Sequence, residues 1–156
     1  MAGDYTRMTF EPRKDHAGVL MQQGRVTLDS DWNAFVRMLD RRLRAETIDI
    51  IGRCVVPKET PDGFRIEVAG GALTIGAGRA YVHGLLAENH GADPVEFDPV
   101  LEEQRGTQPV AYEDQPYFPN AKTAAPLPSS GSQRPHLRGW PREATHAEDP
   151  PLVETR

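Results

Sequence analysis

The spacing of apolar residues is most regular in the first third of the chain, where it predicts one long amphipathic helix ending before Gly52. Apolar residues recur there at the three- and four-residue steps of a single helix face. They are Trp32, Phe35, Val36, Leu39, Leu43, Ile50 and Ile51. Asp29, Ser30 and Asp31 stand at its expected start, where such side chains accept hydrogen bonds from free backbone amides. We expect this apolar face to be buried against other parts of the fold.

Alternating apolar and polar positions after the helix predict antiparallel strands. Residues 64–68 alternate with period two, and Gly70 and Gly71 form a hairpin signal before residues 72–75. A third strand is expected from about residue 79 to residue 88, with a bulge at Gly84. The sequence therefore predicts an α+β fold in which the long amphipathic helix packs on a small, mainly antiparallel β-sheet.

The composition changes sharply near residue 92. Leu, Ile, Val and Phe account for 22 of residues 1–92 but for 10 of residues 93–156, and 11 of the 14 prolines lie from Pro94 onward. A segment so poor in aliphatic side chains cannot bury enough apolar surface to fold alone. We predict an α+β anchoring module at residues 1–92. Residues 93–156 are predicted to be an extended Pro/Gly/Ser-rich arm, with one edge strand near residues 95–97, ordered mainly by contacts with partner chains.

The charge and the cysteine content exclude several classes of protein. The net charge is −5, and residues 1–52 carry eight basic and eight acidic side chains, so the basic surplus of a nucleic-acid-binding domain is missing. Cys54 is the single cysteine and excludes an internal disulfide. The start of the chain lacks a secretory signal, and no apolar run approaches the length of a membrane span. We therefore expect a cytoplasmic protein without a membrane span.

Candidate catalytic and cofactor-binding motifs have simpler structural explanations. The sequence Gly76-Ala77-Gly78 resembles a phosphate loop, but the predicted strand that follows it favours a turn or bulge. The five histidines lack metal-ligand spacing, and we interpret them as surface residues, although His83 and His90 could share a metal with Glu88 or Asp93. We predict no cofactor and no metal.

Asp29 and Asp31 could serve as a pair of catalytic carboxylates, but helix capping accounts for both. No serine lies in a G-x-S-x-G nucleophile motif. We therefore predict that the protein is not an enzyme.

Several polar and aromatic residues are better candidates for binding a partner. Gln22 and Gln23 end an apolar run, and Trp32 and Asn33 lie in the first turn of the predicted helix. They could fix the preceding segment against the helix or grip a partner's backbone, and the sequence leaves both interpretations open. The full set of candidate partner-binding residues is Gln22, Gln23, Trp32, Asn33, Arg37, Arg41, Tyr117 and Phe118.

One long motif resembles a known family. Residues 18–33 (GVLMQQGRVTLDSDWN), preceded by GDYTRMTF, resemble the N-terminal signature of an uncharacterised protein family encoded with phage-tail-like contractile injection systems. Residues 76–89, 115–120 and 142–150 resemble that family more weakly. Family members usually continue beyond this point, and residues 129–141 replace a segment that resembles a strand in relatives. The resemblance supplies no catalytic residues.

The resemblance implies a structural component of such a particle, baseplate-associated, that acts as an assembly or anchoring subunit. Its partners would be other baseplate, spike, tube or sheath subunits, and it could form a homo-oligomer within the assembly. Two alternatives stay open. One is a particle-associated carbohydrate-binding module or hydrolase that combines Asp29, Asp31 and Glu88 with Trp32 or Tyr81. The other is an assembly chaperone or adaptor.

Overall fold

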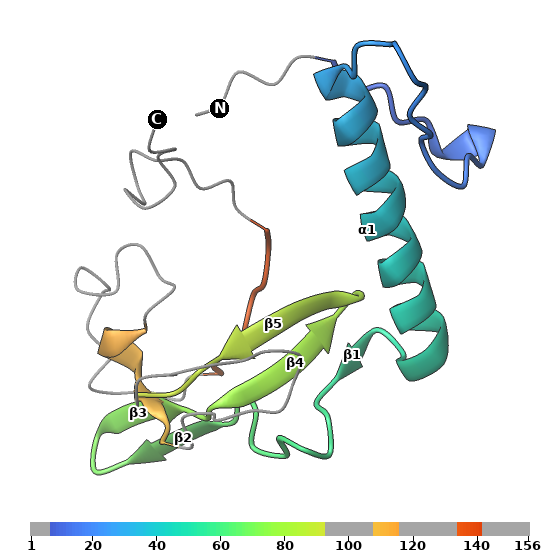
Figure 1. Cartoon of the computed structure of the whole chain (residues 1–156). Helices are drawn as coiled ribbons and strands as arrows, with labels where there is room; N and C mark the ends of the chain where they lie inside the picture. Colours follow the sequence, from blue (N-terminus) through green and yellow to red (C-terminus); the bar gives the residue numbers. More distant parts are fainter. Residues whose placement is uncertain (1–6, 93–107, 116–133, 142–156) are drawn as a thin grey trace, which may run out of the picture. The chain divides into compact units, whose positions relative to one another are not determined.

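The computed structural model describes residues 7–92, 108–115 and 134–141 (Figure 1). The described part has one α-helix and two three-stranded antiparallel sheets, which confirms the predicted α+β class. Its elements are η1 (Pro12–Lys14), α1 (Asp29–Ile51), β1 (Cys54–Val55), β2 (Ile66–Ala69), β3 (Ala72–Ile75), β4 (Gly78–Val82), β5 (Leu85–Asn89), β6 (Val110–Ala111) and η2 (Tyr112–Asp114). The chain forms two compact units, Met1–Thr47 with Gly139–Arg156, and Ile48–Arg138.

Helix α1 ends where the sequence predicts. The amide of Gly52 donates to the carbonyl of Ile48 over 2.9 Å, and Gly52 adopts a φ of 95°. A glycine reaches this left-handed conformation without the steric penalty of a side chain, so the helix stops there. Within the helix, the Nε of Arg44 lies 2.8 Å from the Oδ1 of Asp40, one turn earlier. This is an i, i+4 ion pair, of the kind that adds a few tenths of a kcal/mol to exposed helices.

The first sheet has the order β2-β3-β6, with β3 in the centre, and the predicted hairpin supplies β2 and β3. Gly70 and Gly71 both have positive φ, 59° and 85°, and connect β2 to β3 as a two-residue turn. This turn geometry matches the right-handed twist of the strands it joins. The hairpin prediction is therefore confirmed.

Strand β6 was not predicted, because a strand of two residues carries no readable periodicity. It comes from the predicted arm and pairs with β3, placing Val110 opposite Ile75. Val110 is 2% exposed, the lowest value among the apolar residues that the structure describes as buried. At this point the arm region contributes to the fold itself. The predicted edge strand near residues 95–97 lies outside the described residues.

The second sheet has the order β1-β4-β5 and corrects two predictions. The strand predicted from residue 79 to residue 88 is instead the hairpin of β4 and β5, and the predicted single sheet is two. His83 and Gly84 have positive φ, 48° and 73°, and together make a two-residue turn where a bulge was expected. Histidine is one of the side chains that tolerate positive φ. The amide of His83 also donates to the carbonyl of Arg53 over 2.7 Å, beside β1.

A close backbone contact lies where the two sheets meet, between the turn that precedes β2 and the connection from β3 to β4. The amide of Phe64 donates to the carbonyl of Gly76 over 2.9 Å, and the amide of Gly76 donates to the carbonyl of Arg65 over 2.8 Å. A Cβ on Gly76 would overlap the carbonyl oxygen of Asp62, and one on Gly63 would lie 2.6 Å from the carbonyl oxygen of Arg79. Only glycine fits at these two positions.

Buried polar side chains hold the same region together. Asn89 is buried, and its Nδ2 donates to the carbonyls of Ile75 and Gly76 over 3.2 and 3.0 Å. Its Oδ1 accepts from the amide of Gly91 over 3.1 Å. The Oγ1 of Thr60 accepts from the amide of Arg79 over 3.2 Å. Asn89 thereby ties β5, in the second sheet, to the end of β3, in the first.

We expect Gly76→Ala to destabilise the protein by about 1–3 kcal/mol or more, because the added methyl group meets backbone that cannot rotate away. Gly76 does not have a positive φ, so the expected loss of stability reports the lack of space for a Cβ atom and not a strained backbone conformation. Urea unfolding of the full chain checks the prediction. Gly18→Ala is the matched control, since nothing lies within 4 Å of that position. Equal unfolding midpoints for the two variants would contradict this account of the contact.

Candidate interaction surface on α1

The apolar face predicted for α1 is exposed, and this corrects the expectation that it is buried. Its members range from 39% exposed, at Phe35 and Ile51, to 73% at Ile50. We call this surface the apolar stripe, and its residues are Trp32, Phe35, Val36, Leu39, Leu43, Ile50 and Ile51. Large exposed apolar patches on soluble proteins mark interaction sites more often than isolated exposed residues do. The apolar stripe is therefore the candidate functional site.

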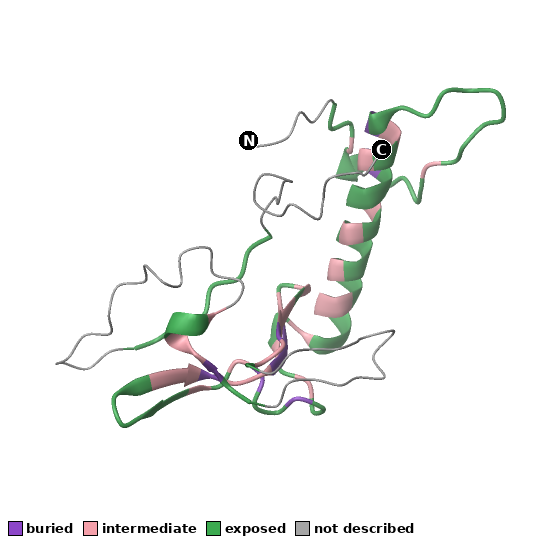
Figure 2. Cartoon of the chain, turned by 60° about the vertical axis from the view of Figure 1, so that its left-hand side comes forward, coloured by how far each residue is buried: buried purple, intermediate pink, exposed green. Residues whose placement is uncertain are grey.

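The buried residues of α1 lie on a different side of the helix. They are Ser30 and Ala34, 5% and 7% exposed, in the first two turns (Figure 2). Each residue advances about 100° around a helix, so Ala34 lies about 160° away from Trp32. Small side chains permit close approach of another segment, but they add little to a hydrophobic pattern. For this reason the hydrophobic pattern predicts burial of a side of the helix that is exposed in the structure.

Two aromatic rings widen the apolar stripe near its N-terminal end. The ring centroids of Trp32 and Phe35 are 6.2 Å apart, and the ring planes are tilted by 48°. Tilted aromatic pairs at this separation attract one another beyond simple area burial. Trp32 is 63% exposed despite this contact, so most of its indole surface is open to a partner.

The charges beside the apolar stripe are of both signs. Asp40 and Arg44 neutralise each other in the ion pair described above, while Arg42 and Asp49 are exposed. Glu46 lies in line with the stripe, between Leu43 and Ile50. A surface with mixed charge and an apolar centre suits a protein partner of similar character better than a polyanion.

The structure separates the residues that the sequence proposed as partner-binding. Gln22 and Gln23 are exposed in a turn, where the carbonyl of Gln22 accepts from the amide of Arg25 over 3.3 Å. The segment that precedes the helix, residues 18–28, contains no strand. Asn33 is half-buried beside Trp32. Tyr117 and Phe118 lie outside the described residues.

The two candidate arginines do not join Trp32 on the apolar stripe. Arg37 and Arg41 are exposed, but at about 100° per residue they lie about 140° and 180° around the helix from Trp32. A single partner on the stripe would therefore not contact both arginines. Of the predicted set, Trp32 is the residue that belongs to the apolar stripe.

The two carboxylates considered for catalysis act at the start of α1. The amides of Asp31 and Trp32 donate to the carbonyl of Leu28 over 3.0 and 3.4 Å, which makes Leu28 the N-cap. The Oδ2 of Asp31 accepts from the amide of Leu28 over 3.2 Å, which is the return half of a capping box. The Oδ1 of Asp29 accepts from the amide of Ser30 over 2.9 Å. The capping interpretation is confirmed.

The remaining candidates for chemistry are the histidines and the single cysteine. Among the described residues, no group of three or more His, Cys, Asp or Glu side chains could hold a metal ion. His83 sits in the β4–β5 turn, with its Nδ1 3.4 Å from the Nη1 of Arg53, and Cys54 is exposed in β1. In the part of the chain that the structure describes, no helix is both long and apolar enough to cross a membrane.

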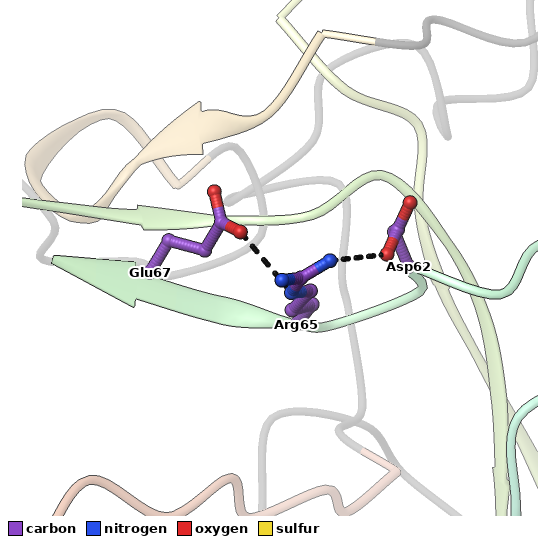
Figure 3. Close-up of polar contacts among 3 residues, drawn as sticks. All are labelled: Asp62, Arg65 and Glu67. Carbon is purple, nitrogen blue, oxygen red and sulfur yellow. Dashed lines mark hydrogen bonds and ion pairs between the residues drawn. The ribbon is translucent and has the colours of Figure 1, made fainter. Parts of the chain in front are cut away.

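A cluster of three charged side chains lies in the turn before β2 and at the start of that strand (Figure 3). The guanidinium of Arg65 contacts two carboxylates, with its Nη1 2.9 Å from the Oδ1 of Asp62 and its Nε 3.1 Å from the Oε1 of Glu67. The hydrogen bond to Asp62, and then the charge of Glu67, raise the pKa of Arg65 above its usual value. Because all three side chains are exposed, water and salt screen their attraction. We interpret this cluster as a local brace for the turn before β2.

The fold and the apolar stripe together define a small α+β protein with exposed apolar side chains along one face of α1. The chain belongs to a family of unknown function (DUF6519), whose model matches residues 1–92. That range includes α1 and both β-hairpins, and it ends at the residue where the composition changes. Comparisons with curated proteins and with solved structures found no match.

We expect Asp31→Ala to destabilise α1 by about 1 kcal/mol, because it removes the acceptor of the Leu28 amide and a negative charge near the positive end of the helix dipole. Thermal unfolding followed by circular dichroism at 222 nm measures the loss. Asp49→Ala is the matched control. It removes the same side chain near the other end of the helix, where a negative charge is unfavourable, and should leave stability unchanged or slightly higher. Equal losses in both variants would contradict the capping role.

Proposed function

We propose that this protein is a non-enzymatic structural component of a phage-tail-like contractile injection system. It is associated with the baseplate and acts as an assembly or anchoring subunit through protein–protein contacts. The observation that carries the proposal is the exposed apolar stripe of α1. The resemblance of residues 18–33 to proteins encoded with such systems supports the kind of particle, and this motif extends into the first turns of α1.

The energetics favour a covered stripe. Trp32, Val36, Leu39 and Leu43 are 63%, 45%, 46% and 54% exposed. Fully burying one large apolar side chain contributes about 1.5–3 kcal/mol, so covering the exposed parts of these four gains several kcal/mol before the cost of association. A subunit that contacts several neighbours loses its translational and rotational freedom only once, so each further contact stabilises the assembly. An apolar face of this size is therefore suited to a permanent place in a particle.

The proposed partners are other baseplate, spike, tube or sheath subunits, and assembly takes place in the cytoplasm. Residues 93–156 supply the second part of the proposal. Val110, in β6, pairs with β3, and this pairing supports strand addition as a way for the region to make contacts. We propose that the remainder of the region, including Tyr117 and Phe118, contacts neighbouring subunits.

The test is to purify assembled particles from cells that express the complete gene cluster and to quantify this chain in them by mass spectrometry. We expect the wild-type chain to be retained in the particles at a fixed stoichiometry. Leu43→Glu should reduce its incorporation at least tenfold, because the variant places a charge in the apolar stripe. Ala45→Glu introduces the same charge at an exposed position on the opposite side of α1, and should incorporate normally.

Two results would overturn the proposal. Particles that assemble and function normally without the chain, and that do not retain it when it is present, would show that it is not a structural component. Equal incorporation of the two glutamate variants would show that the apolar stripe is not the attachment surface. Circular dichroism of the purified variants confirms that each one is folded.

A further inference from the structure

The apolar stripe has the spacing of a coiled-coil seam. Its positions advance by steps of four, three and four residues through Trp32, Val36, Leu39 and Leu43, and the same alternation continues through Glu46 to Ile50. Apolar residues that alternate in this way fit as knobs into the holes of a second helix. The pattern is therefore compatible with a helical partner.

We propose that the occupant of the apolar stripe is α1 of a second copy of this chain, packed antiparallel with Val36 of one copy opposite Leu39 of the other. In this register Trp32 packs on Leu43 of the second copy, and the arrangement repeats by symmetry. Four apolar layers result. The inference rests on the proposed function, since it assumes that the stripe is a docking surface, and it names the first partner.

The charges beside the seam select this register over two others. A parallel pair would place Glu46 against Glu46 of the second copy inside the seam, which is unfavourable for two carboxylates. A longer antiparallel overlap, with Leu39 opposite Leu43, would bring Arg42 beside Arg42 and Asp40 beside Asp40. Like charges facing one another across a seam oppose the pairing.

The proposed register avoids those contacts. Arg42 comes beside the ring of Phe35 of the second copy, where a guanidinium and an aromatic face attract each other. Asp40 comes beside Asn33 in place of a second carboxylate. Glu46 falls beyond the four apolar layers, where it and Asp29 of the second copy remain in water. The antiparallel arrangement also sets the two helix dipoles in opposite directions, which is favourable.

The contact is short, so it forms a reversible dimer. Four layers from one helix of each copy bury less surface than the roughly 1,200 Å² at which stable interfaces begin. We therefore expect a dissociation constant in the micromolar range for the isolated chain, and a tighter pair where the surrounding particle holds both copies.

Sedimentation equilibrium of the full chain between about 1 and 200 µM tests the dimer. We expect a monomer–dimer equilibrium for the wild type, at least tenfold weaker association for Leu39→Glu, and unchanged association for Ala45→Glu, with all three proteins folded by circular dichroism. A wild-type chain that stays monomeric at every concentration would overturn the inference. So would equal weakening in the two variants.

Disulfide trapping tests the register. Cys54 is the single cysteine, so Cys54→Ser gives a background without thiols. In that background, Val36→Cys chains mixed with Leu39→Cys chains should form mixed disulfides faster than either chain does with itself. Preferred Leu39→Cys homodimers would indicate parallel pairing and overturn the inference.

The two proposals fail separately. A monomeric chain that is still incorporated into particles through the apolar stripe would overturn the second-copy inference and leave the proposed function standing. A chain that dimerises as described but is never retained in particles would overturn the proposed function.

Discussion

The β part of this protein depends on a close approach between Gly76 and the turn at residues 62–65. Gly76 exchanges two backbone hydrogen bonds with this turn, and the space beside it is too small for any side chain. Asn89 then binds the carbonyl of Gly76 from the second sheet. Among the described residues of the two sheets, the buried apolar side chains are Ile75, Ala80 and Val110. Backbone contact and buried hydrogen bonds therefore join the two sheets at this point.

The sequence predicts the parts of the fold whose signals are local. Asp31 and Gly52 mark the ends of α1, and Gly70 and Gly71 mark the first hairpin. The second hairpin is missed because His83 is not a typical turn residue, although it tolerates the required positive φ. Strands β1 and β6 are too short to show a period, and their partners are distant in sequence. The role of Gly76 appears only when residues 62–65 lie against it.

The candidate site shows a different limit of prediction from sequence. The periodicity of α1 correctly predicts which side chains share one face, but the sequence does not tell which molecule covers that face. In the structure the expected buried residues, such as Trp32 and Leu39, are exposed, while Ser30 and Ala34 are buried. In the proposed pairing, the seam spacing favours a helical partner and the flanking charges favour one register over two others, which hydrophobicity alone does not do.

The central claim is that the apolar stripe of α1 is covered by another chain in the assembled state. The chain has two tryptophans, Trp32 and Trp140, so Trp140→Phe leaves Trp32 as the sole indole fluorophore. The most direct measurement is acrylamide quenching of Trp32 in the free, dilute chain and in purified particles. The account predicts strong quenching in the dilute chain, with a blue-shifted emission and marked protection in the particle. Equal quenching in the two states would contradict it.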